Sequence, residues 1–142
     1  MEANAKQFKK RNAILACLQH TDMHPSAEMV HEMLREMHPD ISLATVYRNL
    51  SHFKSQGLIQ SLGTVNGIER FDATRTPHVH FICTGCGRIL DLPEVELPLS
   101  LSRDVERGCG GQVHSCQLTF TGLCRSCRNS CQPGGESRQA IQ

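Results

Sequence analysis

This sequence lacks a long hydrophobic run, a secretory signal and any large excess of charge of one sign. No stretch approaches the roughly 18 apolar residues of a membrane span. The first ten residues are polar, with no apolar run behind a basic start. We therefore expect a cytoplasmic protein with no membrane partner. The net charge of +1 does not by itself indicate a nucleic-acid binder.

Positive charge is nevertheless concentrated in two segments. Residues 42–62 hold Arg48 and Lys54 with no acid, and residues 1–11 hold Glu2 against four basic side chains. Those four are Lys6, Lys9, Lys10 and Arg11. Either segment suits a phosphate-facing surface, although a solvated helix face explains the same charges equally well.

The length and the cysteine content point to small domains that need a stabilising disulfide, metal or partner chain. A chain of 142 residues forms one medium domain or two small ones. Two domains of about 70 residues would be marginal on burial alone, because small domains bury a low fraction of their surface. The sequence holds eight cysteines. In the cytosol, clustered cysteines more often bind metal than form disulfides.

The N-terminal half has apolar residues at helical spacing. They predict helices over residues 5–19 and 27–37 and a third helix from Ser42. Ser26 is a good N-cap for the second helix, and Gly57 lies where a C-terminal glycine cap of the third belongs. The apolar stripe of the second helix is expected in the core rather than as a methionine metal site. It consists of Met29, Val30, Met33, Leu34 and Met37.

Two short strands follow, over residues 58–62 and 68–72, around a turn at 63–67. Three helices and then a hairpin are the order of a winged helix. In that fold the third helix enters the major groove of DNA and the hairpin is the wing. The N-terminal domain is therefore predicted at residues 1–72.

Beyond a linker at 73–77 the pattern changes to a small α/β domain over residues 78–130. Its predicted elements are strands at 78–83, 88–92 and 112–121 and a helix at 94–107, in which Pro98 limits the first turns. The polar tail, residues 131–142, is expected to be disordered. The fold class is therefore α+β.

Two cysteine pairs lie in the second domain, Cys83-x-x-Cys86 and Cys124-x-x-Cys127. Four thiolates in two such pairs suit a tetrahedral structural Zn²⁺. Zinc would contribute folding energy to a domain of this size. The alternative is a pair of redox dithiols, but two matched pairs in one small domain favour zinc. Cys17 is expected in the core, and no function is assigned to Cys109, Cys116 or Cys131.

A second set of possible ligands consists of histidines and aspartates. His78 and His80 alternate on one strand, so both rings point to the same face. Asp91 lies on the neighbouring strand, and Asp72 ends the wing. Such nitrogen and oxygen ligands suit Fe²⁺, Mn²⁺ or Zn²⁺. The spacing alone leaves open that these are ordinary surface residues.

Taken together, the motifs resemble the ferric uptake regulator (Fur) family over roughly residues 11–128. They are SLATVYRNL at 42–50, GLI at 57–59, RFD at 70–72, HVH at 78–80, FICTGCG at 81–87 and the second cysteine pair. The resemblance implies a winged helix joined to a zinc-bearing dimerisation domain, with a regulatory Fe²⁺ or Mn²⁺ at the hinge. Its ligands, carried over by position, would be His24, Asp72, His78, His80 and Asp91.

The resemblance also implies a function. A homodimer binds a palindromic double-stranded DNA operator and represses transcription. The hinge metal fixes the angle between the two winged helices, so it is an effector that favours the DNA-binding state. The residues resembling the family's DNA contacts are Ala44, Thr45, Tyr47 and Arg48, and Arg11 is placed to touch phosphate. The alternative for Tyr47 is a core aromatic, because it borders the apolar stripe.

The aspartates at 72 and 91 distinguish branches of the family. Aspartate occupies both places in the peroxide-sensing (PerR) branch, whereas the iron-sensing branch tends to carry glutamate. Five ligands would leave one position on Fe²⁺ open to peroxide, and the resemblance implies His24 and His78 as the oxidised rings. The alternative is an iron-responsive or other metal-responsive repressor without peroxide sensing.

The sequence departs from the family pattern in two places. Of a Thr-Pro-Gln-Arg segment at the first conserved helix, only Arg11 is present. Pro77 and Val79 stand where ligands of a further metal site would flank His114, so His114 is read as structural or incidental. No nucleophile–base pair or substrate-binding loop accompanies the His/Asp set, so we expect neither an enzyme nor an organic substrate. Besides a DNA-binding regulator and a metalloenzyme, the third class of protein to consider is a zinc-stapled interaction module that never binds DNA.

Overall fold

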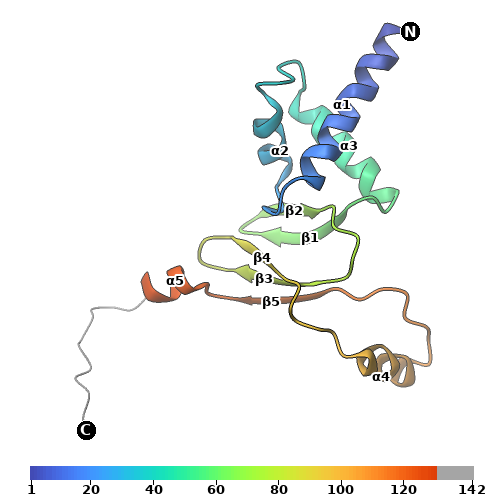
Figure 1. Cartoon of the computed structure of the whole chain (residues 1–142), viewed down its shortest axis with the longest axis vertical. Helices are drawn as coiled ribbons and strands as arrows, with labels where there is room; N and C mark the ends of the chain where they lie inside the picture. Colours follow the sequence, from blue (N-terminus) through green and yellow to red (C-terminus); the bar gives the residue numbers. More distant parts are fainter. Residues whose placement is uncertain (131–142) are drawn as a thin grey trace.

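The computed structural model describes residues 1–130. The predicted disordered tail and Cys131 lie outside the described residues. The N-terminal part contains α1 (Glu2–Gln19), α2 (Ala27–Leu34), α3 (Leu43–Ser55), β1 (Gln60–Val65) and β2 (Ile68–Asp72). The C-terminal part contains β3 (Val79–Cys83), β4 (Ile89–Leu92), α4 (Leu99–Cys109), β5 (Leu118–Gly122) and α5 (Arg125–Ser130). The helices α1 to α3 lie at one end, and the two sheets follow in layers beneath them (Figure 1).

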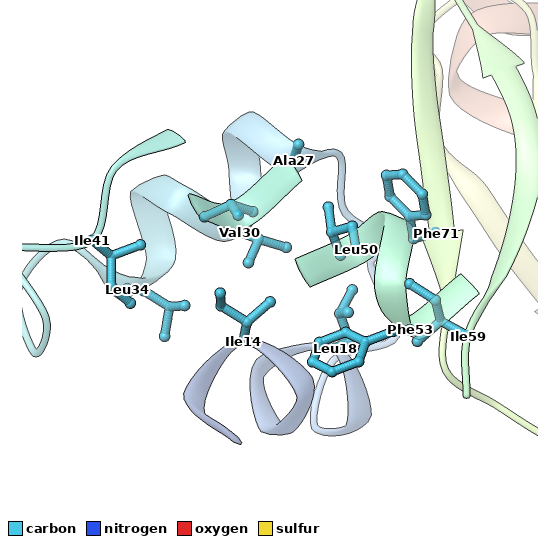
Figure 2. Close-up of a cluster of buried hydrophobic side chains, with 11 residues drawn as sticks. Ile14, Leu18, Ala27, Val30, Leu34, Ile41, Leu50, Phe53, Ile59 and Phe71 are labelled. Atoms are coloured by element: carbon cyan, nitrogen blue, oxygen red, sulfur yellow. The ribbon is translucent and has the colours of Figure 1, made fainter. Parts of the chain in front are cut away.

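The three N-terminal helices pack around one buried cluster. Ile14 of α1, Val30 of α2 and Leu50 of α3 meet at its centre, and Phe71 of β2 closes it from the wing (Figure 2). Ser26 accepts a hydrogen bond from the Met29 amide at 3.2 Å, which caps α2 as predicted. The order of three helices and a hairpin, and with it the α+β winged-helix fold, is confirmed.

The predicted apolar stripe of the second helix is only partly correct. Val30 and Leu34 are buried, but Met33 and Met37 are 44% and 78% exposed. The helix ends at Leu34, so Met37 lies in the turn beyond it, where the helical spacing no longer applies. The prediction that these two methionines belong to the core was wrong.

The wing is longer and its turn is tighter than predicted. The strand β1 continues to Val65, and Asn66 and Gly67 have φ values of 52° and 81°. Two residues with positive φ form the turn that matches the twist of a hairpin. Val65, together with Leu62, packs on Ile82 and Ile89, so the wing contacts the second sheet.

The second sheet has the order β4-β3-β5, with β3 antiparallel to β4 and parallel to β5. Because β3 and β5 are parallel, their carboxyl ends lie at the same edge of the sheet. The helix predicted from residue 94 begins only at Leu99, after Pro98. The strand predicted from residue 112 begins only at Leu118.

The helix α4 stands away from both sheets (Figure 1) and has no buried residue. None of the helices within residues 1–130 combines the length and the apolarity that a membrane span requires. The division of the chain at 73–77 stays a prediction from the sequence.

Candidate metal centres

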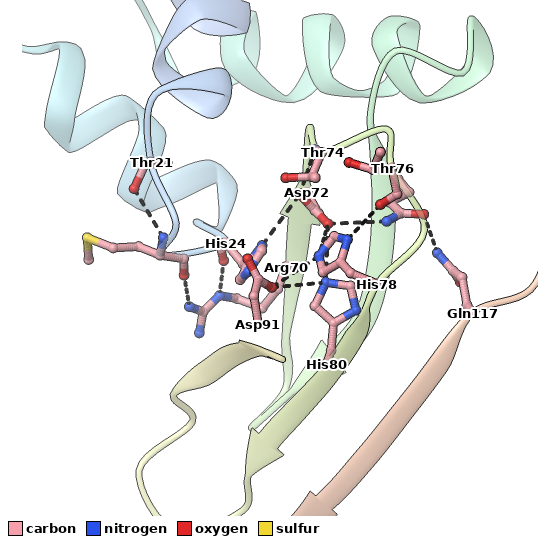
Figure 3. Close-up of polar contacts among 12 residues, drawn as sticks. Thr21, His24, Arg70, Asp72, Thr74, Thr76, His78, His80, Asp91 and Gln117 are labelled. Carbon is pink, nitrogen blue, oxygen red and sulfur yellow. Dashed lines mark hydrogen bonds and ion pairs between the residues drawn. The ribbon is translucent and has the colours of Figure 1, made fainter. Parts of the chain in front are cut away.

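Five histidine and aspartate side chains meet where the two parts of the chain touch (Figure 3). They form two overlapping triads that share His80: one with His24 and Asp72, the other with His78 and Asp91. The donor atoms of each triad lie within 4.8 Å of one another. We call these five residues the hinge cluster.

Several donor atoms of the hinge cluster lie about as far apart as neighbouring ligands of a metal ion. His24 Nε2 lies 2.7 Å from Asp91 Oδ1, and His80 Nε2 lies 3.2 Å from Asp72 Oδ2. His78 Nε2 lies 3.1 Å from Asp91 Oδ1 and 3.3 Å from Asp72 Oδ2. Donors about 2.1 Å from one octahedral ion are about 3 Å apart at adjacent positions. These four separations have the size expected between neighbouring ligands of a metal ion.

Three of the five ligands lie on strands, His78 directly precedes β3, and His24 lies in a loop. Asp72 ends β2, and His80 in β3 is the register partner of Asp91 in β4. The rings of His78 and His80 have centroids 4.2 Å apart, so they share a face as predicted. His24 lies in the loop between α1 and α2 with a left-handed φ of 48°. That conformation is uncommon for a residue other than glycine and strains the backbone.

Two members of the hinge cluster have a pKa shifted in the direction that favours metal binding. Burial lowers the pKa of His80, and the neighbouring charge of His78 lowers it further. Burial alone would raise the pKa of Asp72, but hydrogen bonds from Thr74 and Gln60 and the charge of His24 lower it on balance. A neutral imidazole and an ionised carboxylate are the forms that bind a cation. His24, Asp72 and His80 are at most 4% exposed.

The four cysteines of the two pairs also meet at one point. Cys83 ends β3, Cys124 follows β5, and their knuckles bring Cys86 and Cys127 into the same cluster. The sulfurs of Cys86 and Cys124 are 3.9 Å apart. Two thiolates bound to one tetrahedral zinc at about 2.3 Å would be about 3.8 Å apart. The cluster therefore has the dimensions of a structural zinc site.

The cysteine cluster needs a cation to ionise fully. The amides of Cys124 and Cys86 donate hydrogen bonds to the Cys83 sulfur and lower the pKa of that thiol to about 6. Hydrogen bonds with the three other cysteines raise the pKa of Cys127 to about 12. Zinc would remove this conflict by binding all four as thiolates. Gly85 allows the two knuckles to approach closely, because a Cβ there would lie 3.0 Å from the Cys127 sulfur.

The predicted DNA-facing residues lie on the outer side of α3. Ala44 and Arg48 are exposed, and Thr45 is half-buried. Tyr47 is 45% exposed and donates a hydrogen bond to Glu28, so the alternative of a core aromatic is wrong. Arg11 is half-buried, and its Nε donates to Asn49 Oδ1 at 3.3 Å. The structure thus attaches Arg11 to α3.

Several residues that contact these sites were not predicted from the sequence. Gln60 donates a hydrogen bond to Asp72 Oδ2 at 3.2 Å, and Asp40 forms ion pairs with Lys6 and Lys10 at 2.9 and 3.0 Å. Asp40 therefore neutralises part of the N-terminal positive charge. Arg70 was also missed, although its position two residues before Asp72 on one strand was a usable signal.

Comparisons with known proteins agree with this arrangement. The model of the ferric uptake regulator family matches residues 2–121. The peroxide operon regulator of Bacillus subtilis (strain 168) is 34% identical over 131 residues, covering 89% of this chain and 86% of that protein. The peroxide stress regulator of Campylobacter jejuni superposes with a TM-score of 0.77 at 28% identity, covering 89% of this chain and 94% of that one.

An iron-bound relative superposes as well. The ferric uptake regulator of Francisella tularensis with iron has a TM-score of 0.69 at 28% identity, covering 83% of this chain and 90% of that one. The family match spans both the helices with their wing and the sheet that carries the cysteines. The chain therefore belongs to the ferric uptake regulator family.

Proposed function

We propose that this protein is a metal-dependent, DNA-binding transcriptional repressor that senses peroxide. The observation that carries the proposal is the origin of the five donors in the hinge cluster. His24 and Asp72 come from the part with the winged helix, and His78, His80 and Asp91 come from the second sheet. One ion held by all five would fix the angle at which the winged helix is presented.

Coupling to DNA follows from this bridging. An ion that binds only when both sets of donors are close stabilises the arrangement in which they are close. If that arrangement matches the spacing of two DNA half-sites, metal concentration sets the affinity for the operator. Fe²⁺ or Mn²⁺ fits the mixed nitrogen and oxygen donors, and Zn²⁺ fits the four cysteines.

Peroxide sensing is supported by the donor set and by the relatives. Both carboxylates are aspartates, as in the peroxide-sensing branch, and the first-named relatives are peroxide regulators. A hollow of about 580 Å³ opens beside His78 and Asp91, and the Asp91 side chain is 29% exposed. Small oxidants from solvent therefore have a route to the cluster.

The proposed oxidation acts on the histidine rings. Bound Fe²⁺ would supply the redox chemistry that Mn²⁺ does not. The ring of His24 or His78 gains one oxygen atom from hydrogen peroxide, and the other oxygen leaves as water. The oxidised ring is a poorer ligand, so the two parts of the chain separate at the hinge and the DNA is released.

DNA contacts are assigned to α3, through Ala44, Thr45, Tyr47 and Arg48. The guanidinium of Arg48 is suited to two hydrogen bonds with a guanine edge. Arg11 lies against the same helix and supports it next to the phosphate backbone. A location in the cytoplasm follows from this role. The hinge cluster is proposed as a sensor and not as the active site of an enzyme.

A homodimer is the proposed assembly. The helix α4, the edge strand β5 and the residue after it expose apolar side chains that a second copy would cover, namely Leu99, Leu101, Val105, Phe120 and Leu123. A dimer also matches the two-fold symmetry of palindromic DNA sites. Sedimentation of the metal-loaded protein should give twice the chain mass of 15.8 kDa. A single-chain mass would contradict the dimer.

The direct test is DNA retention with and without Mn²⁺. The purified zinc-containing protein should retain palindromic operator-type DNA about 10- to 100-fold more tightly with Mn²⁺ than after chelation, within the usual range of allosteric coupling. A scrambled duplex of equal length is the control. Equal retention in both states would contradict metal dependence, and no retention at all would favour a zinc-stapled interaction module.

A further inference from the structure

Arg70 is a half-buried cation whose hydrogen bonds reach the backbone beside both candidate metal centres. It lies on β2, two residues before Asp72, and its guanidinium donates three hydrogen bonds to backbone carbonyls; Figure 3 shows the one to His24. Nε donates to the oxygen of His24, Nη2 to that of Met23 at 2.8 Å, and Nη1 to that of Gly87 at 3.1 Å.

The side chain has no acidic partner within residues 1–130. Burial lowers the pKa of Arg70, which is the direction expected for a cation taken out of water. A charge in that position is tolerated only when its donors are satisfied. The rigid fork of a guanidinium satisfies three carbonyls in fixed directions, which the single ammonium of a lysine does not.

One end of this contact holds the loop that carries His24. The left-handed φ of 48° at His24 is strained, and such a conformation persists only where the surroundings fix it. Arg70 holds the carbonyls of Met23 and His24, and the Phe71 amide donates to the oxygen of Pro25 at 3.2 Å. With the loop so fixed, the His24 ring points at Asp91, 2.7 Å away.

The other end of the contact is the first cysteine knuckle. Gly87 follows Cys86, has a φ of 71°, and its amide donates to the oxygen of Cys83 at 2.8 Å. A Cβ on Gly87 would lie 3.0 Å from Asn66 Nδ2 at the tip of the wing. The carbonyl that Arg70 uses is thus part of the turn that zinc would hold rigid.

We propose that Arg70 is a positioning residue that couples the two metal centres. It transmits the rigidity of the zinc knuckle to the loop of His24 and so prepares that ligand for the hinge metal. The proposal rests on the hinge cluster being the metal site of the proposed function. Residues that orient a ligand from outside the coordination sphere typically contribute 10- to 100-fold to metal affinity.

The test measures Mn²⁺ affinity of the zinc-containing full chain by electron paramagnetic resonance. Arg70→Gln should weaken Mn²⁺ binding about 10- to 100-fold, and Arg70→Lys should give an intermediate loss. Arg88→Gln is the matched control, since Arg88 is exposed beside the same knuckle and its side chain has no hydrogen bond or ion pair to the described residues. Its affinity should stay within about 2-fold of the original.

A double-mutant cycle separates positioning of His24 from general destabilisation. Once His24→Ala has removed the ligand, adding Arg70→Gln should change Mn²⁺ affinity by less than about 2-fold. Equal losses in both backgrounds would overturn the proposal, and so would unchanged Mn²⁺ binding by Arg70→Gln. Zinc content and circular dichroism verify that each variant is folded.

The same measurement distinguishes this inference from the proposed function. Mn²⁺ affinity is read without DNA. If the double-mutant cycle gives the expected result but the protein does not bind DNA, the proposed repressor function is wrong and the role of Arg70 stands. A protein that binds DNA in response to Mn²⁺, but in which Arg70→Gln weakens Mn²⁺ binding equally with and without His24, would overturn the role of Arg70 and leave the repressor standing. No Mn²⁺ binding at the hinge cluster would overturn both.

Discussion

Cys124→Ser is expected to lose its bound zinc and to unfold the second sheet. Cys124 is 8% exposed, and its amide donates to the Cys83 sulfur at 3.3 Å, so it lies at the centre of the cluster. Apart from its cysteines, that sheet has few buried apolar side chains, namely Val79, Ile82 and Ile89, and Val65 of the wing packs against the last two. Structural zinc contributes on the order of 10 kcal/mol in comparable sites, far more than such a core supplies.

The measurement is zinc per chain by elemental analysis, together with thermal melting followed by circular dichroism. The control is Cys116→Ser, which makes the same change at an exposed thiol outside the cluster. The control should keep one zinc per chain and the original melting temperature. If Cys124→Ser also kept one zinc and its melting temperature, the cluster would not be a structural zinc site.

His80→Ala is expected to abolish the response of DNA binding to Mn²⁺. His80 is 2% exposed and is the one residue shared by both triads of the hinge cluster. Its loss removes a nitrogen donor and leaves Asp72 without the imidazole 3.2 Å away. DNA retention with Mn²⁺ should fall to the level of the chelated protein, a loss of about 10- to 100-fold.

Two further variants make this result specific. His20→Ala removes an exposed histidine whose ring has no hydrogen bond within residues 1–130 besides the one to the Ala16 oxygen, and it should keep the full Mn²⁺ response. Asp91→Asn preserves side-chain volume while removing a charged donor, and it should behave as His80→Ala. A normal Mn²⁺ response in both His80→Ala and Asp91→Asn would show that the hinge cluster is not the regulatory site.

Local patterns predicted most of the helical part and the sets of possible ligands. The serine at 26 and the glycines that break the helices are read from neighbours in sequence, because capping and turn geometry are local. The alternation of His78 and His80 likewise follows from the two-residue period of a strand. The pairs Cys83/Cys86 and Cys124/Cys127 were recognised as one possible zinc site because each pair is a short local motif, and the structure brings the four together.

The remaining contacts join residues that are distant in sequence. Lys10 and Asp40 are 30 positions apart, and Arg70 and Gly87 are 17 apart, so no local period relates them. The contact of the wing with the second sheet through Val65 depends on how the two parts dock. The exposure of Met37 depends on where α2 ends, which its propensities do not determine.

The most direct measurement compares the Fe²⁺ and Mn²⁺ forms on operator-type DNA before and after brief exposure to peroxide. Mass spectrometry of the peptides that contain His24 and His78 accompanies it. We predict that only the Fe²⁺ form releases DNA and that one of the two histidines gains an oxygen atom. If both forms keep their DNA and neither peptide gains mass, the protein is an iron-responsive or other metal-responsive repressor and not a peroxide sensor.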